Sequence, residues 1–154
     1  LLGIDLVVII YNFFDDIAHE TRLPPGVHDK FIYFKNLEAY LNRSPIKDEL
    51  TLLKRLGFSI RFCSDHGCVV AHGNGQRIDK YLIESASKRA TLISKSDLAR
   101  FYDVNQYQIP FIDDRKIALL AKNRTLFANK SYVGISHGGV TLEELVVPFV
   151  EVAP

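Results

Sequence analysis

The sequence contains no methionine and no tryptophan, and only two cysteines among its 154 residues. Two cysteines provide no disulfide framework, and Cys63 and Cys68 lack the CxxC spacing of a redox or zinc pair. We therefore expect two buried structural thiols and a cytoplasmic protein. Because the initiator methionine is also missing, we expect the chain to be a piece of a longer protein.

Long apolar runs and a large excess of one charge are also absent. No apolar run approaches the ~20 residues that a membrane helix needs, so we expect no membrane partner. Hydrophobic residues make up 47% of the chain and charged residues 24%, which is ordinary for a globular protein. A chain of 154 residues can bury a core of its own, so we expect residues 1–154 to form a single domain.

The net charge of +1 is unevenly spread along the chain. Residues 76–131, called the basic segment below, contain 11 Lys and Arg against 6 Asp and Glu, whereas the remainder contains 8 against 12. A local excess of positive charge can attract an anionic substrate, although most charged residues simply face solvent.

The first third of the chain shows a strand, helix, helix, strand pattern. The run from Ile4 to Phe14 is almost continuously apolar, which is typical of a strand buried on both faces. Helical spacing follows at residues 29–41 and again from Ser44 to Gly57, with Ser44 as the expected N-cap. The stretch FSIRFC, residues 58–63, then predicts a second strand. This order favours a right-handed parallel crossover and an α/β fold.

The remainder gives weaker signals. We expect a helix at residues 78–89, and short strands at residues 116–120, 125–128, 131–135 and 146–152.

Three segments place acids and histidines just beyond apolar runs of this kind. They are YNFFDDIAHE after the first run, SDHG after the second and SHGG after a later one. In open α/β sheets, ligands bind outside the carboxyl ends of the strands. The three segments can therefore converge although they lie far apart in the sequence.

The chemistry of these segments fits a divalent metal. Asp15 and His19 are four residues apart, so a helical turn would place them on one face. With Asp65, His66 and His137 they offer carboxylate and imidazole ligands, which suit zinc or manganese, while carboxylate also suits magnesium. Each motif alone is more often a surface pair, a turn or a loop. Their joint occurrence favours a metal site, whereas the isolated His28 and His72 are expected to be structural.

These motifs resemble those of a known family. SDHG after a strand, and SHGGVTLEELVVPFVEV near the end of the chain, look like the PglZ domain of the alkaline phosphatase superfamily. YNFFDDIAH also resembles a stretch of that family. The resemblance covers the whole chain, and is best at the start and at residues 62–73 and 131–152.

The resemblance implies an alkaline-phosphatase-like fold, with a mostly parallel sheet and helices on both faces, of which this chain is the C-terminal part. It also implies two divalent metal ions, zinc or manganese, with magnesium as a further option. By analogy Asp15, His19 and His137 hold one ion, and Asp65 and His66 help to hold the second. The nucleophile and the other ligands would lie upstream of Leu1, so we expect the fragment to be inactive alone.

The function implied is a metal-dependent phosphatase or phosphodiesterase, in BREX-type bacterial phage defence or in signalling. The expected partners are a phosphate-containing anion, such as a nucleotide or nucleic acid, and other subunits of a complex. We expect Lys88, Arg89, Arg100 and Arg124 of the basic segment to contact substrate phosphates, because Arg binds phosphate oxygens in a bidentate way. A solvated surface is the alternative. A non-catalytic PglZ-like interaction domain and a phosphoglycerate-mutase-like enzyme are competing functions.

Overall fold

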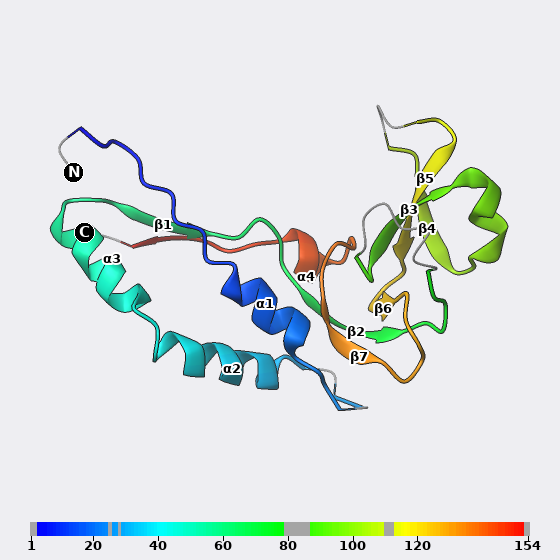
Figure 1. Ribbon diagram of the computed structural model, residues 1–154, viewed down its shortest axis with the longest axis horizontal. Coiled ribbons are helices and arrows are strands. Elements are labelled where there is room, and N and C mark those ends of the chain that lie inside the picture. Colours follow the sequence, from blue (N-terminus) through cyan, green and yellow to red (C-terminus); the bar gives the residue numbers. More distant parts are fainter. Residues whose placement is uncertain (1–2, 25, 28, 79–86, 110–112, 153–154) are drawn as a thin grey trace.

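The computed structural model describes residues 3–24, 26–27, 29–78, 87–109 and 113–152, and Figure 1 shows how its elements are arranged. The helices are α1 (Phe13–Glu20), α2 (Phe31–Leu41), α3 (Ile46–Arg55), the short 3-10 helix η2 (Lys95–Arg100) and α4 (Leu142–Leu145). The strands are β1 (Ile60–Cys63), β2 (Val69–Gly73), β3 (Ala90–Ser94), β4 (Val104–Tyr107), β5 (Lys116–Ala121), β6 (Thr125–Leu126), β7 (Val133–Ser136) and β8 (Phe149–Val152).

The described strands form three small sheets instead of one large sheet. β1 pairs with β8, β2 lies between β6 and β7, and β5 lies between β3 and β4. The pairings are antiparallel except for the two-residue parallel contact between β2 and β6. The prediction of a mostly parallel α/β sheet, with helices on both faces, is therefore wrong.

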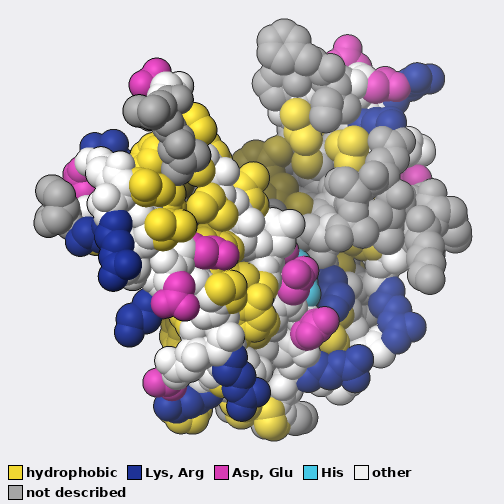
Figure 2. Space-filling view, turned by 60° about the vertical axis from the view of Figure 1, so that its left-hand side comes forward, with side chains coloured by type: hydrophobic (Ala, Val, Ile, Leu, Met, Phe, Trp, Pro, Cys, Tyr) yellow, Lys and Arg dark blue, Asp and Glu magenta, His cyan; other side chains and the backbone are white. Residues whose placement is uncertain are grey.

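The parallel crossover fails because its first strand does not form. Residues 4–11 carry no helix or strand, and within the described part of the chain residues 4–10 make no backbone hydrogen bond. β1, the expected neighbour of that strand, is instead paired in antiparallel register with β8, with Ile60 opposite Val152. Leu6, Val8 and Ile10 are each more than two thirds exposed. Figure 2 shows hydrophobic side chains gathered at the end of the molecule where both termini lie in Figure 1.

In the described part of the chain the core forms three separate clusters, of which the smallest consists of Val69, Ala71 and Leu126. One cluster joins α1 and α2 to β2 and β7, through buried residues that include Ala18, Leu37, Val70 and Ile135. A second cluster, with Ile93 and Leu119 at its centre, lies under the sheet of β3, β5 and β4. Burial of such side chains contributes about 1.5–3 kcal/mol each. The first cluster fixes α1 against β7, and these two elements lead into the candidate site.

Several local predictions are confirmed and others are corrected. α2 and α3 form where helical spacing predicts them, but the Ser44 hydroxyl donates to the Leu41 carbonyl and does not cap α3. Cys63 is exposed, so it is no buried structural thiol. Most of the helix expected at residues 78–89 lies outside the described residues, as does His28. Among the described residues no helix has the length and apolar character needed to span a membrane.

Candidate metal centre

Asp15 and His19 lie on one face of α1, as their spacing predicts. The helix packs on α2 through buried Ala18 and through the Tyr33 hydroxyl, which donates to the Phe14 carbonyl at 3.2 Å. Ile135 of β7 belongs to the same buried cluster, so α1 is held against both α2 and β7. The His19 Nε2 atom lies 3.3 Å from the Asp15 Oδ2 atom, and both side chains are about half exposed.

His137 joins this pair from the loop after β7. Its Nε2 atom lies 3.3 Å from the Asp15 Oδ1 atom and 3.0 Å from the His19 Nε2 atom. His137 lies 118 positions after His19 in the chain. The predicted convergence of the three side chains is therefore confirmed, while their role as metal ligands stays a prediction.

His66 completes the cluster from the loop after β1. Its ring stacks on the His137 ring, with centroids 3.8 Å apart and planes 10° from parallel. One ligand atom each from Asp15, His66 and His137 lies within 4.8 Å of the others. The His66 Nδ1 atom is 3.0 Å from the Gly67 carbonyl. Because a carbonyl can only accept, the neutral tautomer that makes this bond has its proton on Nδ1 and its lone pair on Nε2. Histidines that bind metal through Nε2 usually have such a partner at Nδ1.

Asp65 lies at the margin of the cluster. Its side chain is 88% exposed, and its Oδ1 atom is 3.8 Å from the His66 Nε2 atom. The same oxygen accepts the His66 backbone N–H at 3.1 Å. The geometry therefore groups His66 with Asp15 and His137, while Asp65 serves as a turn acceptor that remains accessible to a second ion.

The spacing of the ligand atoms fits a divalent cation. In a tetrahedral zinc site, bonds of 2.0–2.1 Å place neighbouring ligand atoms about 3.3 Å apart. The separations among Asp15, His19 and His137 are 3.0 and 3.3 Å. The separations of these three side chains match the spacing of ligand atoms around one ion.

The electrostatics of His137 favour the protonation state that a metal ligand needs. Burial lowers the pKa of His137, and the neighbouring His66 imidazole lowers it further, against the opposing effect of Asp15. A neutral imidazole is the form that binds metal. At neutral pH His137 is therefore mainly in the neutral form.

The four predicted substrate-binding residues lie in different surroundings. Lys88 donates to the Tyr132 hydroxyl at 2.7 Å, and Arg124 pairs with Glu143 of α4. Arg100 lies 3.7 Å from Asp97 and lines a separate pocket of about 240 Å³. Arg89 is fully buried and paired with Glu144. The expectation that Arg89 contacts substrate is therefore corrected: its guanidinium is occupied inside the protein.

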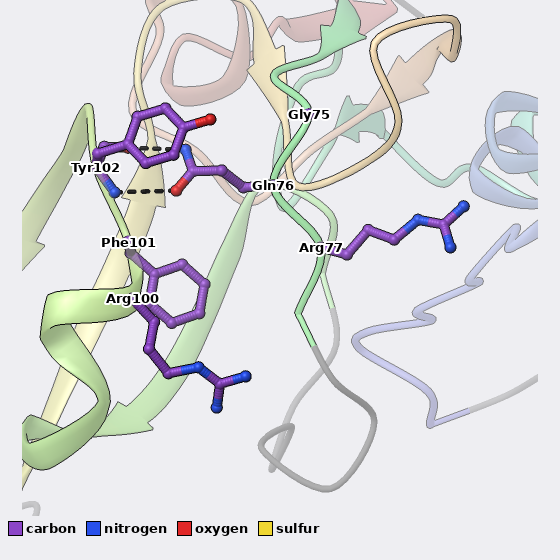
Figure 3. A pocket seen from close by; sticks show the side chains of 6 residues that line it. All are labelled: Gly75, Gln76, Arg77, Arg100, Phe101 and Tyr102. Atoms are coloured by element: carbon purple, nitrogen blue, oxygen red, sulfur yellow. Dashed lines mark hydrogen bonds between the residues drawn. The ribbon is translucent and has the colours of Figure 1, made fainter.

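The pocket beside Arg100 contains none of the metal-cluster residues. It is lined by Gly75, Gln76, Arg77, Arg100, Phe101 and Tyr102. Gln76 closes one wall, because its side-chain amide donates to the Tyr102 carbonyl at 2.7 Å and accepts the Tyr102 N–H at 2.9 Å. In Figure 3 the guanidinium groups of Arg77 and Arg100 do not point toward one another. The pocket thus lacks a convergent pair of cations for a phosphate.

Sequence reasoning missed two residues that hold the site together. Glu144 accepts hydrogen bonds from the loop that follows His137, and Ser87 donates to the His137 carbonyl at 2.8 Å. The T-x-x-E signature of a helix capping box at Thr141 to Glu144 is visible in the sequence, and the structure contains that capping box. No local signal identifies Ser87.

The chain matches no family model, no curated protein and no solved structure. The likeness to the PglZ domain therefore rests on the motifs alone.

Proposed function

We propose that the chain forms the metal-binding part of a phosphoryl-transfer domain, a phosphatase or phosphodiesterase of the PglZ type. One observation carries the proposal. Asp15, His19, His66 and His137 come from three distant segments and place their ligand atoms together. Bringing these partly buried ionisable groups together costs desolvation, which a bound cation would offset.

Each side chain of the cluster would have a distinct role in binding the metal. Asp15, His19 and His137 would hold a divalent cation, and His66 would face it with the Nε2 lone pair that its bond to Gly67 leaves free. The Asp15 carboxylate offsets positive charge, and neutral His137 binds without first losing a proton. A bound divalent ion supplies Lewis acidity and lowers the pKa of a bound water. Asp65 remains available for a second ion.

The substrate class that we propose is a phosphate-containing anion, such as a nucleotide or nucleic acid, handled within a defence or signalling complex. The family resemblance and the charge of the basic segment support this class. Lys88 and Arg124 remain candidates for phosphate contacts, since both have exposed side chains. Arg124 pairs with α4, whose Glu144 carbonyl accepts the Gly67 N–H, so it lies near the loop of His66.

Zinc titration of three purified proteins tests the metal site. The set comprises the wild type, His137→Ala and His72→Ala, the last removing an exposed histidine of β2 outside the cluster. We expect His137→Ala to weaken zinc binding at least about tenfold, because even residues that only support a metal ligand are worth 10–100-fold. His72→Ala should match the wild type. Equal zinc affinity in all three proteins, or none in the wild type, would contradict the proposal.

A further inference from the structure

Glu144 forms the centre of a buried polar unit next to the metal cluster. Its carboxylate accepts from Arg89 Nε at 2.8 Å and from Arg89 Nη2 at 2.7 Å, and both side chains are almost fully buried. It also accepts the Thr141 hydroxyl at 2.8 Å. Arg89 extends the unit by donating to the carbonyls of Ala121 and Thr125. A buried ion pair with every bond satisfied holds its neighbours in one arrangement.

This unit fixes the loop that carries His137. The Gly139 N–H donates to Glu144 Oε1 at 2.9 Å, two residues after the histidine. A Cβ atom on Gly139 would lie 2.3 Å from Arg89 Nη2, so the glycine is needed for the loop to lie on the guanidinium. Ser87, whose hydroxyl accepts the Arg89 N–H at 3.0 Å, holds the His137 carbonyl from the other side.

The same residue also fixes the loop that carries His66. The Gly67 N–H donates to the backbone carbonyl of Glu144 at 2.9 Å. A Cβ atom on Gly67 would lie 2.0 Å from the Glu143 carbonyl oxygen, so this contact also requires a glycine. Glu144 thus contacts the glycine that follows His66 and the second glycine after His137.

We propose that the Arg89–Glu144 pair is the positioning unit of the metal centre. It holds the two histidine loops in register, so that the imidazole rings of His66 and His137 stack with centroids 3.8 Å apart and each offers a ligand atom within 4.8 Å of the other and of Asp15. Neither Arg89 nor Glu144 touches the ion in this proposal. The inference rests on the proposed metal site. It also explains the glycines of the two motifs, Gly67 directly after His66 in SDHG and Gly139 two residues after His137 in SHGG.

The test compares Glu144→Gln with the matched variant Glu143→Gln, which makes the same substitution one position earlier in α4. Both are measured at a temperature where thermal melts show a folded protein. Zinc affinity is measured by competition with a chromophoric chelator. We expect Glu144→Gln to bind zinc about 10–100-fold more weakly, the range for residues that orient metal ligands, and Glu143→Gln to stay within about twofold of the wild type. A folded Glu144→Gln with wild-type affinity would overturn the proposal.

A second readout needs no metal. In NMR spectra of the metal-free protein, Glu144→Gln should shift the ring signals of His66 and His137 and leave those of His72 in place, because the stacking of the two rings depends on both loops. Unchanged ring signals would overturn the inference. If the wild type binds no zinc, the proposed function fails, and these spectra alone decide on the positioning role.

Ser87→Ala covers the case in which Glu144→Gln does not fold. This variant removes only the hydroxyl that donates to the His137 carbonyl. We expect a smaller loss of zinc affinity and a shift confined to the His137 ring signals. A folded Ser87→Ala with wild-type affinity and wild-type ring signals would then count against the proposal.

Discussion

Glu144 is a carboxylate that the fold keeps ionised in its interior. Burial raises the pKa of Glu144, but hydrogen bonds from Arg89, Thr141 and Gly139 outweigh burial and lower the pKa from 4.5 to about 2. The unfolded chain therefore binds a proton at Glu144 at a pH where the folded chain does not. This difference makes stability depend on pH in a defined window.

We predict that acid removes the stability contributed by Glu144 between about pH 4.5 and pH 2. A group with a lowered folded pKa stabilises the protein above its unfolded pKa, and the contribution is lost as the pH falls toward the folded pKa. Urea unfolding at pH 6 and pH 3 should show a loss on the order of 2 kcal/mol that Glu144→Gln lacks. If the wild type and Glu144→Gln showed the same pH dependence of stability, the hydrogen bonds to Glu144 would not be what keeps it ionised in the folded protein.

At the residue scale, the cluster of Asp15, His19 and His137 could be predicted from the sequence. Asp15 and His19 have helical spacing, and SHGG follows a strand, so both signals are local. Arg89 could not be predicted in the same way, because an arginine buried by a distant glutamate looks in the sequence like any surface arginine. Its partner, Glu144, lies 55 positions away.

The exposed apolar segment is the feature of interest at the scale of elements. Leu6, Val8 and Ile10 are 77%, 72% and 79% exposed, while Val7 and Ile9 between them are 38% and 45% exposed. This alternation is that of an extended strand with one face partly covered. Because its backbone groups have no described partner, the segment resembles the edge of a sheet, which favours pairing with another strand.

We predict that this segment makes the chain self-associate. Leu6→Lys with Val8→Lys should reduce the rise of apparent mass with concentration, measured by gel filtration with light scattering, because charges on an edge oppose pairing. The matched variant, Phe31→Lys with Phe34→Lys, removes two exposed aromatic residues of α2. A helix offers no free backbone edge, so this pair should have the smaller effect. Equal effects of the two double variants would contradict the prediction.

Helices and strands differ in how well the sequence predicts them here. α2 and α3 follow from apolar positions at helical spacing, a signal contained within each segment. The run from Ile4 to Phe14 has the composition of a buried strand, but a strand also needs a neighbour. β1 is paired with β8 instead, and α1 begins at Phe13, inside the expected strand.

At the scale of the whole molecule, the mostly antiparallel pairing of the strands could not be predicted, because local sequence patterns do not specify which strands pair. β2 is paired with β7, more than sixty positions away, and β6 with β2. Side chains alternate with a period of two in parallel and antiparallel strands alike, so the apolar pattern does not give the direction of pairing. The predicted convergence of the site motifs does not depend on a parallel sheet, because α1 and the loops after β1 and β7 still lie together.

We predict no hydrolysis by this chain alone. None of the four side chains that converge is a Ser, Thr or Cys nucleophile, and Asp65 and His66 alone do not complete a second site for in-line displacement between two ions. With zinc or manganese added, cleavage of bis(p-nitrophenyl) phosphate should not exceed that of the metal in buffer. Turnover by the purified wild type that His137→Ala abolishes would contradict this prediction.

The most direct measurement of the central claim is anomalous X-ray diffraction at the zinc edge from crystals of the chain grown with zinc. The account predicts a peak within about 2.0–2.2 Å of the His137 Nε2 atom and of an Asp15 oxygen, with the His19 Nε2 atom as a further ligand. A map with no peak between these side chains, or with zinc bound only elsewhere, such as at the exposed Cys63 thiol, would contradict it.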